Sequence, residues 1–416
     1  MTPEIKHRIE KIRRGNVPDG YKKTKAGILP ADWDVYMLGD CLSRVERPVE
    51  VKPNELYTQI GIRSHGKGLF YKEPVTGAAL GNKAVFGIEP DCFIVNIVFA
   101  WEQAIGKTTQ SEVGMIGSHR FPMYRPVNDG VDIDYLISYF LTKRGTDILE
   151  TASPGGAGRN KTLGQDRFLK SKITLPPIEE QRKIAAILTT QDRVIELKEK
   201  RLAEKQRQKK YLMQQLLTSK KRLPGFSGEW SFPKAKELFQ SVSDKDHNGD
   251  LAVLSSTQDR GIVPRVEVDI DIKYDACSLV NYKKVSKGNF VISLRSFQGG
   301  IEYSAYTGLV SPAYTVLSSR KEMSDGYYKQ FFKSTDYINR LNVAVYGIRD
   351  GKQISYEDFG RLQIPYPPIK EQDAIAEVLS TADREIELLQ QDIEQEKQKK
   401  KALMQLLLTG VVRVTI

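Results

Sequence analysis

Hydrophobic residues recur at alternating three- and four-residue steps in two long segments of the chain. In the second segment Leu379, Ala382, Ile386, Leu389 and Ile393 follow this spacing, which is the heptad pattern of helices that pack against each other. The first segment keeps part of the pattern, but polar residues occupy several of its seam positions: Gln191, Lys198, Lys205 and Lys209. A narrow seam with polar interruptions favours two helices packed on each other. The alternative is that each helix packs separately on its own globular neighbour.

The two helical segments are copies of one sequence. The first opens with Pro176-Pro177-Ile178-Glu179-Glu180-Gln181 and the second with Pro367-Pro368-Ile369-Lys370-Glu371-Gln372. Both copies end in Leu-Met-Gln followed by Leu-Leu-Thr, and about half of all positions are identical, with no gap between the registers. Proline before a helix, with Glu and Gln in the first turn, is a start signal. A repeat at this long spacing indicates a duplicated module of globular domain plus helix, rather than a solenoid.

Charge predicts how the two helices pair. Residues 178–222 hold 13 Lys and Arg against 6 Asp and Glu, a net of +7, whereas residues 369–416 hold 7 against 9, a net of −2. The basic run lies in the second half of its helix, and the acidic run lies near the start of the other. An antiparallel arrangement brings the two runs together. Helices of this length would form a spacer about 60 Å long, with a globular domain at each end and a pseudo-two-fold axis between the halves.

Short apolar or alternating runs broken by glycine precede each helix. Residues 92–95 and 290–294 have the pattern of strands, and residues 134–149 and 327–343 that of helices. We therefore predict the α+β class for both globular domains. The predicted boundaries are 1–28 for an N-terminal helical segment, 29–175 for the first globular domain, 176–222 for the central spacer helix, 223–366 for the second globular domain and 367–416 for the C-terminal spacer helix.

The two globular domains resemble each other only at their ends. Leu29-Pro30 with Trp33 opens the first, and Leu223-Pro224 with Trp230 opens the second. Their exits share an Arg-x-(Gly)-Lys-polar segment, at 159–162 and 349–353, but their interiors look unrelated. Similar ends with divergent interiors predict one scaffold that carries two different recognition surfaces.

Composition narrows the class of partner. The 416 residues exceed what one hydrophobic core usually serves, and the net charge of +11 favours a polyanionic partner such as nucleic acid. The alternative is a basic protein that has no polyanionic partner. The three cysteines are scattered and imply no disulfide framework. With no apolar leader at the start and no apolar stretch of bilayer length, we expect no membrane association and a cytoplasmic location.

Motifs that carry catalysis are missing from the sequence. Amino-methyltransferases hold their target amine with Asn/Asp-Pro-Pro-aromatic, whereas the two double prolines here follow Leu175 and Tyr366 and precede isoleucine. No Gly-x-Gly-x-x-Gly opens a strand–helix unit, and residues 155–162 only superficially resemble a phosphate loop. The four histidines lie far apart, so no metal site is expected. We predict that this chain has neither a catalytic residue nor a cofactor of its own.

The paired motif resembles a known family. Leu-Pro-Pro-Ile-x-Glu-Gln followed by a long helix ending in Leu-Met-Gln-x-Leu-Leu-Thr is similar to the specificity (S, HsdS) subunit of type I restriction–modification systems. The first copy matches fully, and the second departs only at Tyr366. The resemblance covers the whole chain. It implies that each globular domain is a target-recognition domain that reads one half of a bipartite, asymmetric double-stranded DNA sequence.

The same resemblance implies partners. In that family the helical spacer sets the gap between the half-sites and binds two modification (methyltransferase) subunits, and motor-nuclease restriction subunits join the complex. S-adenosylmethionine, ATP and Mg²⁺ are then expected in those subunits. We assign partner binding to the helix entrances, at Pro176, Pro177, Gln181, Pro367, Pro368 and Gln372. The alternative functions are an enzyme, for which the chain has no room left, and a coiled-coil structural tether with two anchoring domains.

DNA contacts are expected on loops. Lys, Arg and backbone N–H groups suit phosphates, and Arg, Asn, Gln, Ser and Thr suit base edges. The first-domain candidates are Arg63, Ser64, Lys67, Ser118, Arg120, Arg159, Asn160 and Lys161. The second-domain candidates are Arg260, Arg295, Gln298, Arg349, Lys352 and Gln353. The exit loops, at 159–161 and 349–353, rank first because they occupy matching places in the two copies. For each single residue the alternative is an ordinary solvated surface group.

Overall fold

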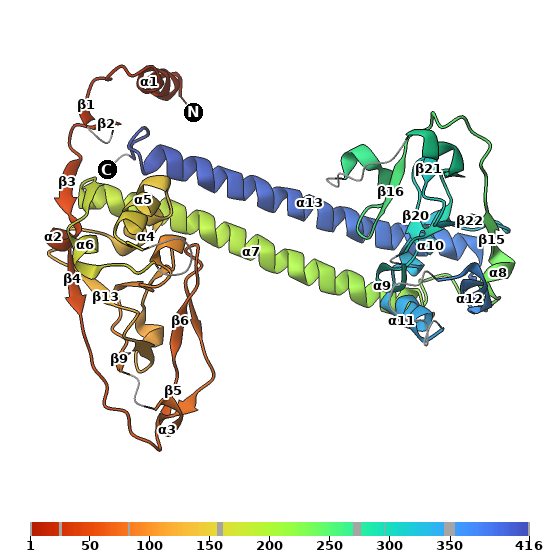
Figure 1. The fold of residues 1–416 in the computed structure, drawn as a ribbon, viewed down its shortest axis with the longest axis horizontal. Coiled ribbons are helices and arrows are strands. Elements are labelled where there is room, and N and C mark those ends of the chain that lie inside the picture. Colours follow the sequence, from red (N-terminus) through yellow and green to blue (C-terminus); the bar gives the residue numbers. More distant parts are fainter. Residues whose placement is uncertain are drawn as a thin grey trace. The chain divides into compact units, whose positions relative to one another are not determined.

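The computed structural model describes residues 2–24, 27–81, 84–155, 161–268, 276–294, 296–344 and 354–414. The chain divides into two compact units (Figure 1). The first unit combines Met1–Leu197 with Ile393–Ile416, and the second contains Lys198–Asp392. Each unit therefore holds one globular part together with a portion of each long helix. The predicted boundaries of the globular domains stay predictions.

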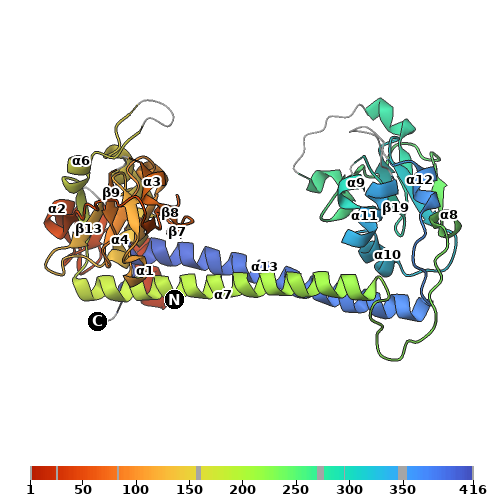
Figure 2. The ribbon, with the colours of Figure 1, turned by 90° about the horizontal axis from the view of Figure 1, so that it is seen from below.

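Two long helices follow the double prolines, as the sequence predicts. Helix α7 covers Ile178–Leu216 and helix α13 covers Ile369–Leu407, and each has 39 residues. At 1.5 Å per residue, each is about 58 Å long. Figure 2 shows both helices as continuous rods. The matching start and length of the two helices are the structural counterpart of the repeated sequence.

The two helices run antiparallel within each unit. In the first unit Gln191 Nε2 donates to the Glu396 carboxylate at 2.6 Å, and Lys400 Nζ pairs with Asp192 at 2.5 Å. In the second unit the partners reverse in order along α13: Lys198 pairs with Asp392, Lys205 with Glu385 and Lys209 with Asp383, at 2.5–2.8 Å. The predicted antiparallel pairing is confirmed. The structure adds that the polar residues at the seam positions, Gln191, Lys198, Lys205 and Lys209, all bond to the opposite helix.

The ends of the helices enter the hydrophobic cores. Ile184 and Leu188 near the start of α7 share the first core with Leu407 and Leu408 at the end of α13. In the second core Leu216 and Leu217 meet Ile375 and Leu379 in the same way. The prediction of mutual packing is therefore confirmed, and the alternative, in which each helix packs only on its own globular neighbour, is wrong.

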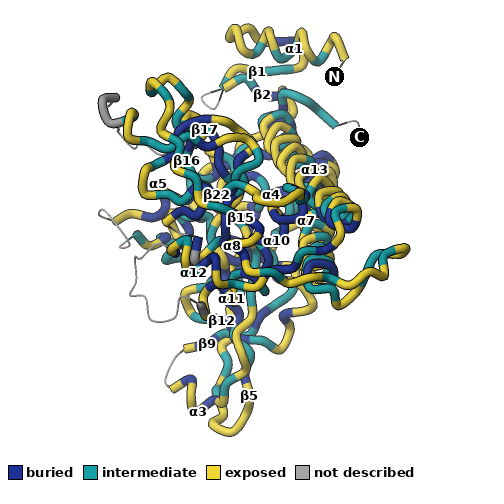
Figure 3. The backbone as a smooth tube through the Cα atoms, turned by 90° about the vertical axis from the view of Figure 1, so that its right-hand side faces the viewer, coloured by how far each residue is buried: buried dark blue, intermediate teal, exposed yellow. Residues whose placement is uncertain are grey.

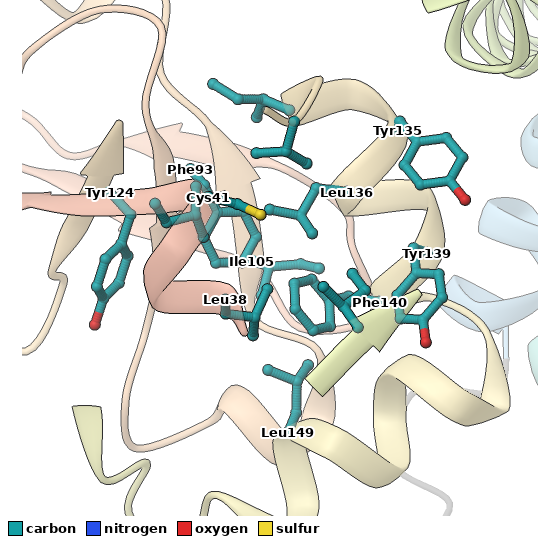
Figure 4. Close-up of a cluster of buried hydrophobic side chains, with 14 of the residues drawn as sticks. Leu38, Cys41, Phe93, Ile105, Tyr124, Tyr135, Leu136, Tyr139, Phe140 and Leu149 are labelled. Atoms are coloured by element: carbon teal, nitrogen blue, oxygen red, sulfur yellow. The ribbon is translucent and has the colours of Figure 1, made fainter. Parts of the chain in front are cut away.

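The first globular part is built on a four-stranded antiparallel sheet in the order β11-β10-β13-β4. Helices α4 and α5 pack against it, and Phe93, Tyr124, Phe140 and Phe168 form its aromatic centre, part of which is seen in Figure 4. The strands are β1 (Tyr21–Thr24), β2 (Gly27–Pro30), β3 (Asp34–Met37), β4 (Leu42–Val45), β5 (Leu56–Tyr57), β6 (Ile60–Ile62), β7 (Leu69–Tyr71), β8 (Val75–Thr76), β9 (Val85–Gly87), β10 (Phe93–Val95), β11 (Ile105–Lys107), β12 (Ile116–Ser118), β13 (Met123–Pro126) and β14 (Lys172–Leu175). The helices are α1 (Pro3–Arg13), α2 (Leu38–Cys41), α3 (Gly77–Leu80), α4 (Ile133–Phe140), α5 (Lys143–Thr151) and α6 (Gln165–Leu169), with 3₁₀ turns η1 (Ala100–Glu102) and η2 (Gln110–Glu112).

The second globular part repeats this plan with a sheet in the order β15-β22-β19-β20. Helices α10 and α11 take the places of α4 and α5, and Phe239, Phe290, Tyr328 and Phe332 form the aromatic centre. The strands are β15 (Phe239–Val242), β16 (Leu254–Thr257), β17 (Gly261–Pro264), β18 (Lys283–Val285), β19 (Phe290–Ile292), β20 (Glu302–Tyr303), β21 (Gly308–Val310) and β22 (Thr315–Ser319). The helices are α8 (Ala235–Leu238), α9 (Ser296–Gly299), α10 (Asp325–Phe331), α11 (Thr335–Ala344) and α12 (Tyr356–Arg361), with 3₁₀ turns η3 (Arg265–Glu267) and η4 (Ala276–Asn281). The predicted α+β class is confirmed.

The predicted helices at 134–149 and 327–343 are each divided in two. Thr142 Oγ1 accepts from Gly145 N at 3.2 Å and so begins α5, and Ser334 Oγ accepts from Tyr337 N at 3.2 Å at the start of α11. A hydroxyl that caps the backbone in this way starts a new helix. The apolar periodicity alone did not reveal the break, because buried residues continue on both sides of it: Tyr139 and Phe140 in α4, and Gly145 and Leu149 in α5. Figure 3 shows the burial of the backbone along the chain.

A buried glutamate joins the start of each long helix to the end of the other. Glu180 is fully buried and accepts from Trp33 Nε1 at 3.1 Å and from the Arg413 guanidinium at 2.6 and 2.7 Å. Arg413 also binds Asp32 and holds the pKa of that carboxyl below its usual value. In the second unit Glu371, also fully buried, accepts from Arg222 at 2.6 Å and from Trp230 Nε1 at 2.9 Å.

The neighbouring glutamines are buried as well and hold the globular parts. Gln181 Oε1 accepts from the backbone N–H of Asp132, the N-cap of α4, at 3.0 Å. Gln372 Oε1 accepts from the N–H of Ser324, the N-cap of α10, at 2.9 Å. The repeated Glu-Gln pair is therefore one structural device used twice. Its glutamate ties the helices together, and its glutamine orients the globular part.

Arg413→Met tests the contact between the buried Glu180 carboxylate and the Arg413 guanidinium in the first unit. We expect a loss of about 3 kcal/mol in the free energy of unfolding, because Glu180 is left as an unpaired buried charge. Urea denaturation of the full chain measures it. Glu180→Gln combined with Arg413→Met should recover a large part of the loss, and Arg361→Met, on an exposed helix face, is the control. A single variant as stable as the parent would contradict this account.

Candidate nucleic-acid interface

In the first unit, Arg63, Ser64 and Lys67 lie at the tip of the β6–β7 hairpin. The tip is tied to the 3₁₀ turn η1: His65 N donates to Glu102 O at 2.8 Å, and Ser64 Oγ donates to the Glu102 carboxylate at 3.0 Å. Arg63 donates to Leu69 O at 2.7 Å and lies over the Phe70 ring. Lys67 is exposed. A tip held this firmly can present Lys67 to a phosphate without further ordering.

Three other candidates of the first unit lie within the described residues: Ser118, Arg120 and Lys161. Ser118 ends β12, and its Oγ accepts from the backbone N–H of Arg120 at 3.3 Å. The Arg120 side chain is exposed. Ser118 and Arg120 line a hollow of about 770 Å³ together with Asn96 and Gln59. Lys161 lies over the Trp101 ring, with Nζ 5.1 Å from its centroid. An ammonium on an indole face is held there by the ring quadrupole.

In the second unit the candidates lie on two neighbouring loops. Arg260 occupies the turn between β16 and β17, where its guanidinium donates to Glu267 O at 3.1 Å and remains exposed. Gln298 is exposed in the short helix α9. The backbone of Gly299, next to Gln298, approaches the side chain of Gln258, two residues before Arg260. The structure therefore brings Arg260 and Gln298 into one neighbourhood, which sequence separation did not reveal.

Six predicted DNA-contact residues fall outside the described residues. They are Arg159, Asn160, Arg295, Arg349, Lys352 and Gln353. Both exit loops, except for Lys161, belong to this set, so their role stays a prediction.

Each unit has a crevice between its hairpin tip and the long helices. In the first unit it measures about 710 Å³ and reaches from His65 to the end of α13, and in the second about 870 Å³, from Arg260 to the middle of α13. The sequence analysis missed several basic residues of the first crevice: Lys143, Arg144, Lys397, Lys400 and Lys401. They come from α5 and α13, about 250 residues apart, so only folding brings them together. The charged residues that line the first crevice are all basic. The second crevice is lined by basic residues and also by four acidic ones, Asp259, Glu302, Asp383 and Glu387.

The predicted partner-binding residues are mostly internal. Pro176, Gln181, Pro367 and Gln372 are buried, and both glutamines bond within the chain. Pro177 and Pro368 are exposed at equivalent places. The partner-binding role stays a prediction, and Pro177 and Pro368 are its accessible members.

Within the described ranges, no group of three His, Cys, Asp or Glu side chains is placed to hold a metal ion. No helix there has an apolar stretch long enough to cross a bilayer.

Known proteins share this architecture. The chain is 26% identical over 428 aligned positions to MjaX of Methanocaldococcus jannaschii, which carries the provisional name of a type I restriction enzyme specificity subunit; the alignment covers 95% of this chain and 97% of that protein. The fold matches the HsdS subunit from Thermoanaerobacter tengcongensis with a TM-score of 0.50, at 18% identity over 92% of this chain and 98% of the other.

A second solved chain, from a study of complex assembly and conformational transition of the type I R-M system, matches with a TM-score of 0.57, at 18% identity over 92% of this chain and 99% of the other. The model of the type I restriction modification DNA specificity domain matches residues 89–207 and 227–398. These two matched regions fall on the two copies of the repeat. The chain therefore belongs to the type I restriction–modification DNA specificity family.

Proposed function

We propose that this chain is the DNA-recognition subunit of a type I restriction–modification complex, and that each globular part reads one half of a bipartite, asymmetric target. The observation that carries the proposal is the duplication itself. One scaffold, with the same sheet order and the same glutamate–arginine device, presents two hairpin tips of different sequence. Two unlike surfaces on one repeated frame suit two unlike half-sites.

The helix pair suits the role of a ruler between the half-sites. Each of its termini is fixed by a buried glutamate, and cross-helix ion pairs define one register. Half-sites one DNA turn apart lie about 34–36 Å from each other, which a helix pair of about 58 Å can bridge.

Catalysis is assigned to partners under this proposal. Two modification subunits would dock at the repeated entrances marked by Pro177 and Pro368, and motor-nuclease subunits would join them. S-adenosylmethionine, ATP and Mg²⁺ would then be bound by those subunits. The solved relative from a study of complex assembly supports the idea of a multi-subunit partner system. Cytoplasmic DNA is the substrate that such a complex would meet.

The competing proposal is a structural tether with two anchoring domains. It accounts for the helix pair, but it gives no reason for two different loop sets on one scaffold. Salt-sensitive and sequence-selective DNA binding separates the two proposals, because a tether would lack it.

Lys67→Ala tests phosphate contact in the first unit. We expect weaker binding to all DNA sequences alike and a salt slope smaller by about 1, because one ammonium no longer releases a counterion. Competition binding at two salt concentrations measures both quantities. Lys170→Ala removes another exposed lysine outside the predicted loops and should leave the slope unchanged. An unchanged slope for Lys67→Ala would remove this residue from the interface.

A matched insertion of seven residues into both long helices tests the ruler. Inserted between Lys198 and Lys205 and between Glu385 and Asp392, one heptad, or about two helical turns, lengthens the pair by about 10 Å, or about three base pairs. We expect a longer unspecified gap and unchanged half-site bases in the methylation pattern of cells that carry the complex. Insertion into one helix alone should abolish recognition, because the ion pairs lose register. Altered half-site bases would contradict the ruler.

Methyl transfer should depend on partner subunits. We expect the purified chain to transfer no methyl group from labelled S-adenosylmethionine to DNA, and the complex with modification subunits to do so. Methylation by the chain alone would show that catalysis was assigned to the wrong subunit.

A further inference from the structure

One lysine joins the two candidate DNA loops of the second unit. Lys333 Nζ donates to Gln258 O in the β16–β17 turn at 3.1 Å and to Gly299 O at the end of α9 at 3.0 Å. Its third bond is to the carboxylate of Glu302 in β20. Arg260 lies two residues beyond the first carbonyl, and Gln298 directly precedes the second. A single ammonium group therefore sets the separation between the loops that carry Arg260 and Gln298.

The lysine is anchored to the core rather than to the surface. It lies between α10 and α11, and its neighbour Phe332 is buried in the second core. Glu302 is 2% exposed, burial raises its pKa, and its Oε2 has no hydrogen-bond partner within the described residues. Lys333 is thus the cation that compensates a buried carboxyl, which keeps its ammonium group inside the crevice.

Glycines allow the loops to close around this anchor. A Cβ at Gly300 would lie 2.0 Å from Phe332 O, and one at Gly261, which has φ +78°, would lie 2.7 Å from Tyr303 O. Only glycine permits backbone to approach backbone this closely. The hairpin turn, the end of α9 and β20 therefore converge on Lys333 at contact distance.

We propose that Lys333 is a positioning residue for sequence recognition, which holds the Arg260 and Gln298 loops in the arrangement that reads the second half-site. This inference rests on the proposed function and assigns to it a residue that need not touch DNA. Base reading tolerates errors of only about 0.5 Å in side-chain placement. If the two loops moved apart, Arg260 and Gln298 would still be present, but they would no longer match one set of base edges.

The first unit has an uncharged counterpart. Gln103 Nε2 donates to Thr146 Oγ1 of α5 at 2.6 Å, and Gln103 O accepts from Gly66 N in the Arg63–Lys67 tip at 2.9 Å. Both units thus tie a hairpin tip to their helix pair, at α4–α5 or at α10–α11, through one polar residue. The second unit uses the charged side chain of Lys333 for this. Within the described residues Lys333 bonds to two candidate loops, whereas Gln103 bonds to one.

The test combines Lys333→Met with Glu302→Gln, so that no buried charge is left unpaired. Cells carrying the chain with its modification subunits are compared by sequencing all methylated sites. We expect about tenfold weaker discrimination at one or more bases of the second half-site, with the first half-site and the gap unchanged. Glu302→Gln alone is the comparison: its amide oxygen can still accept from Lys333 Nζ and the bonds to Gln258 O and Gly299 O stay, so we expect a clearly smaller loss of discrimination than in the double variant.

Lys329→Met is the matched control. It removes the same charge from α10 in the same crevice, but Lys329 lies over the Tyr303 ring and makes neither carbonyl bond in the described structure. It should leave the motif unchanged. An unchanged motif and occupancy in the double variant would overturn the proposal, and so would an equal loss at both half-sites, which would show only a folding role. If the parent complex methylated no two-part sequence, the proposed function itself would fail instead.

Discussion

The arrangement of this chain depends on a buried carboxylate at the start of each long helix. Glu180 and Glu371 are fully buried, and each is neutralised by an arginine that follows the end of the other helix. A buried charge without its partner is strongly destabilising, so the two chain segments are required to meet. The start of one helix, the end of the other and the entrance tryptophan are thereby fixed in one place, once in each unit.

The cross-helix ion pairs have a different task. Their side chains are partly exposed, and such pairs contribute about 0–1 kcal/mol each. These ion pairs define the direction and register of the helix pair. The Lys209–Asp383 and Lys400–Asp192 pairs occupy equivalent positions in the two copies of the repeat, whereas the Lys198–Asp392 pair has no equivalent in the other copy. Buried apolar contacts stabilise the pair, and the charges select its direction and register.

A rigid repeated frame leaves the recognition surfaces free to differ. The sheets, the helix pairs and the Glu-Gln device are the same in the two units, but the first crevice is cationic and the second is mixed. In the first unit the loop anchor is an amide, and in the second it is the Lys333 ammonium group. The loops can therefore differ between the two units while the frame that carries them stays the same.

The sequence by itself determined the repeat, the long helices, their antiparallel direction and the family. Each of these follows from signals in the linear sequence: the repeated motif, proline before the helix, the apolar seam and the opposite charge runs. Tertiary structure alone decided the burial of Gln181 and Gln372, and the proximity of the loops that carry Arg260 and Gln298. Those features depend on which residues distant in sequence come together, and one-dimensional periodicity does not contain that information. Lys333 shows this most clearly, because its three partners lie 31 to 75 positions away and none is marked by a motif.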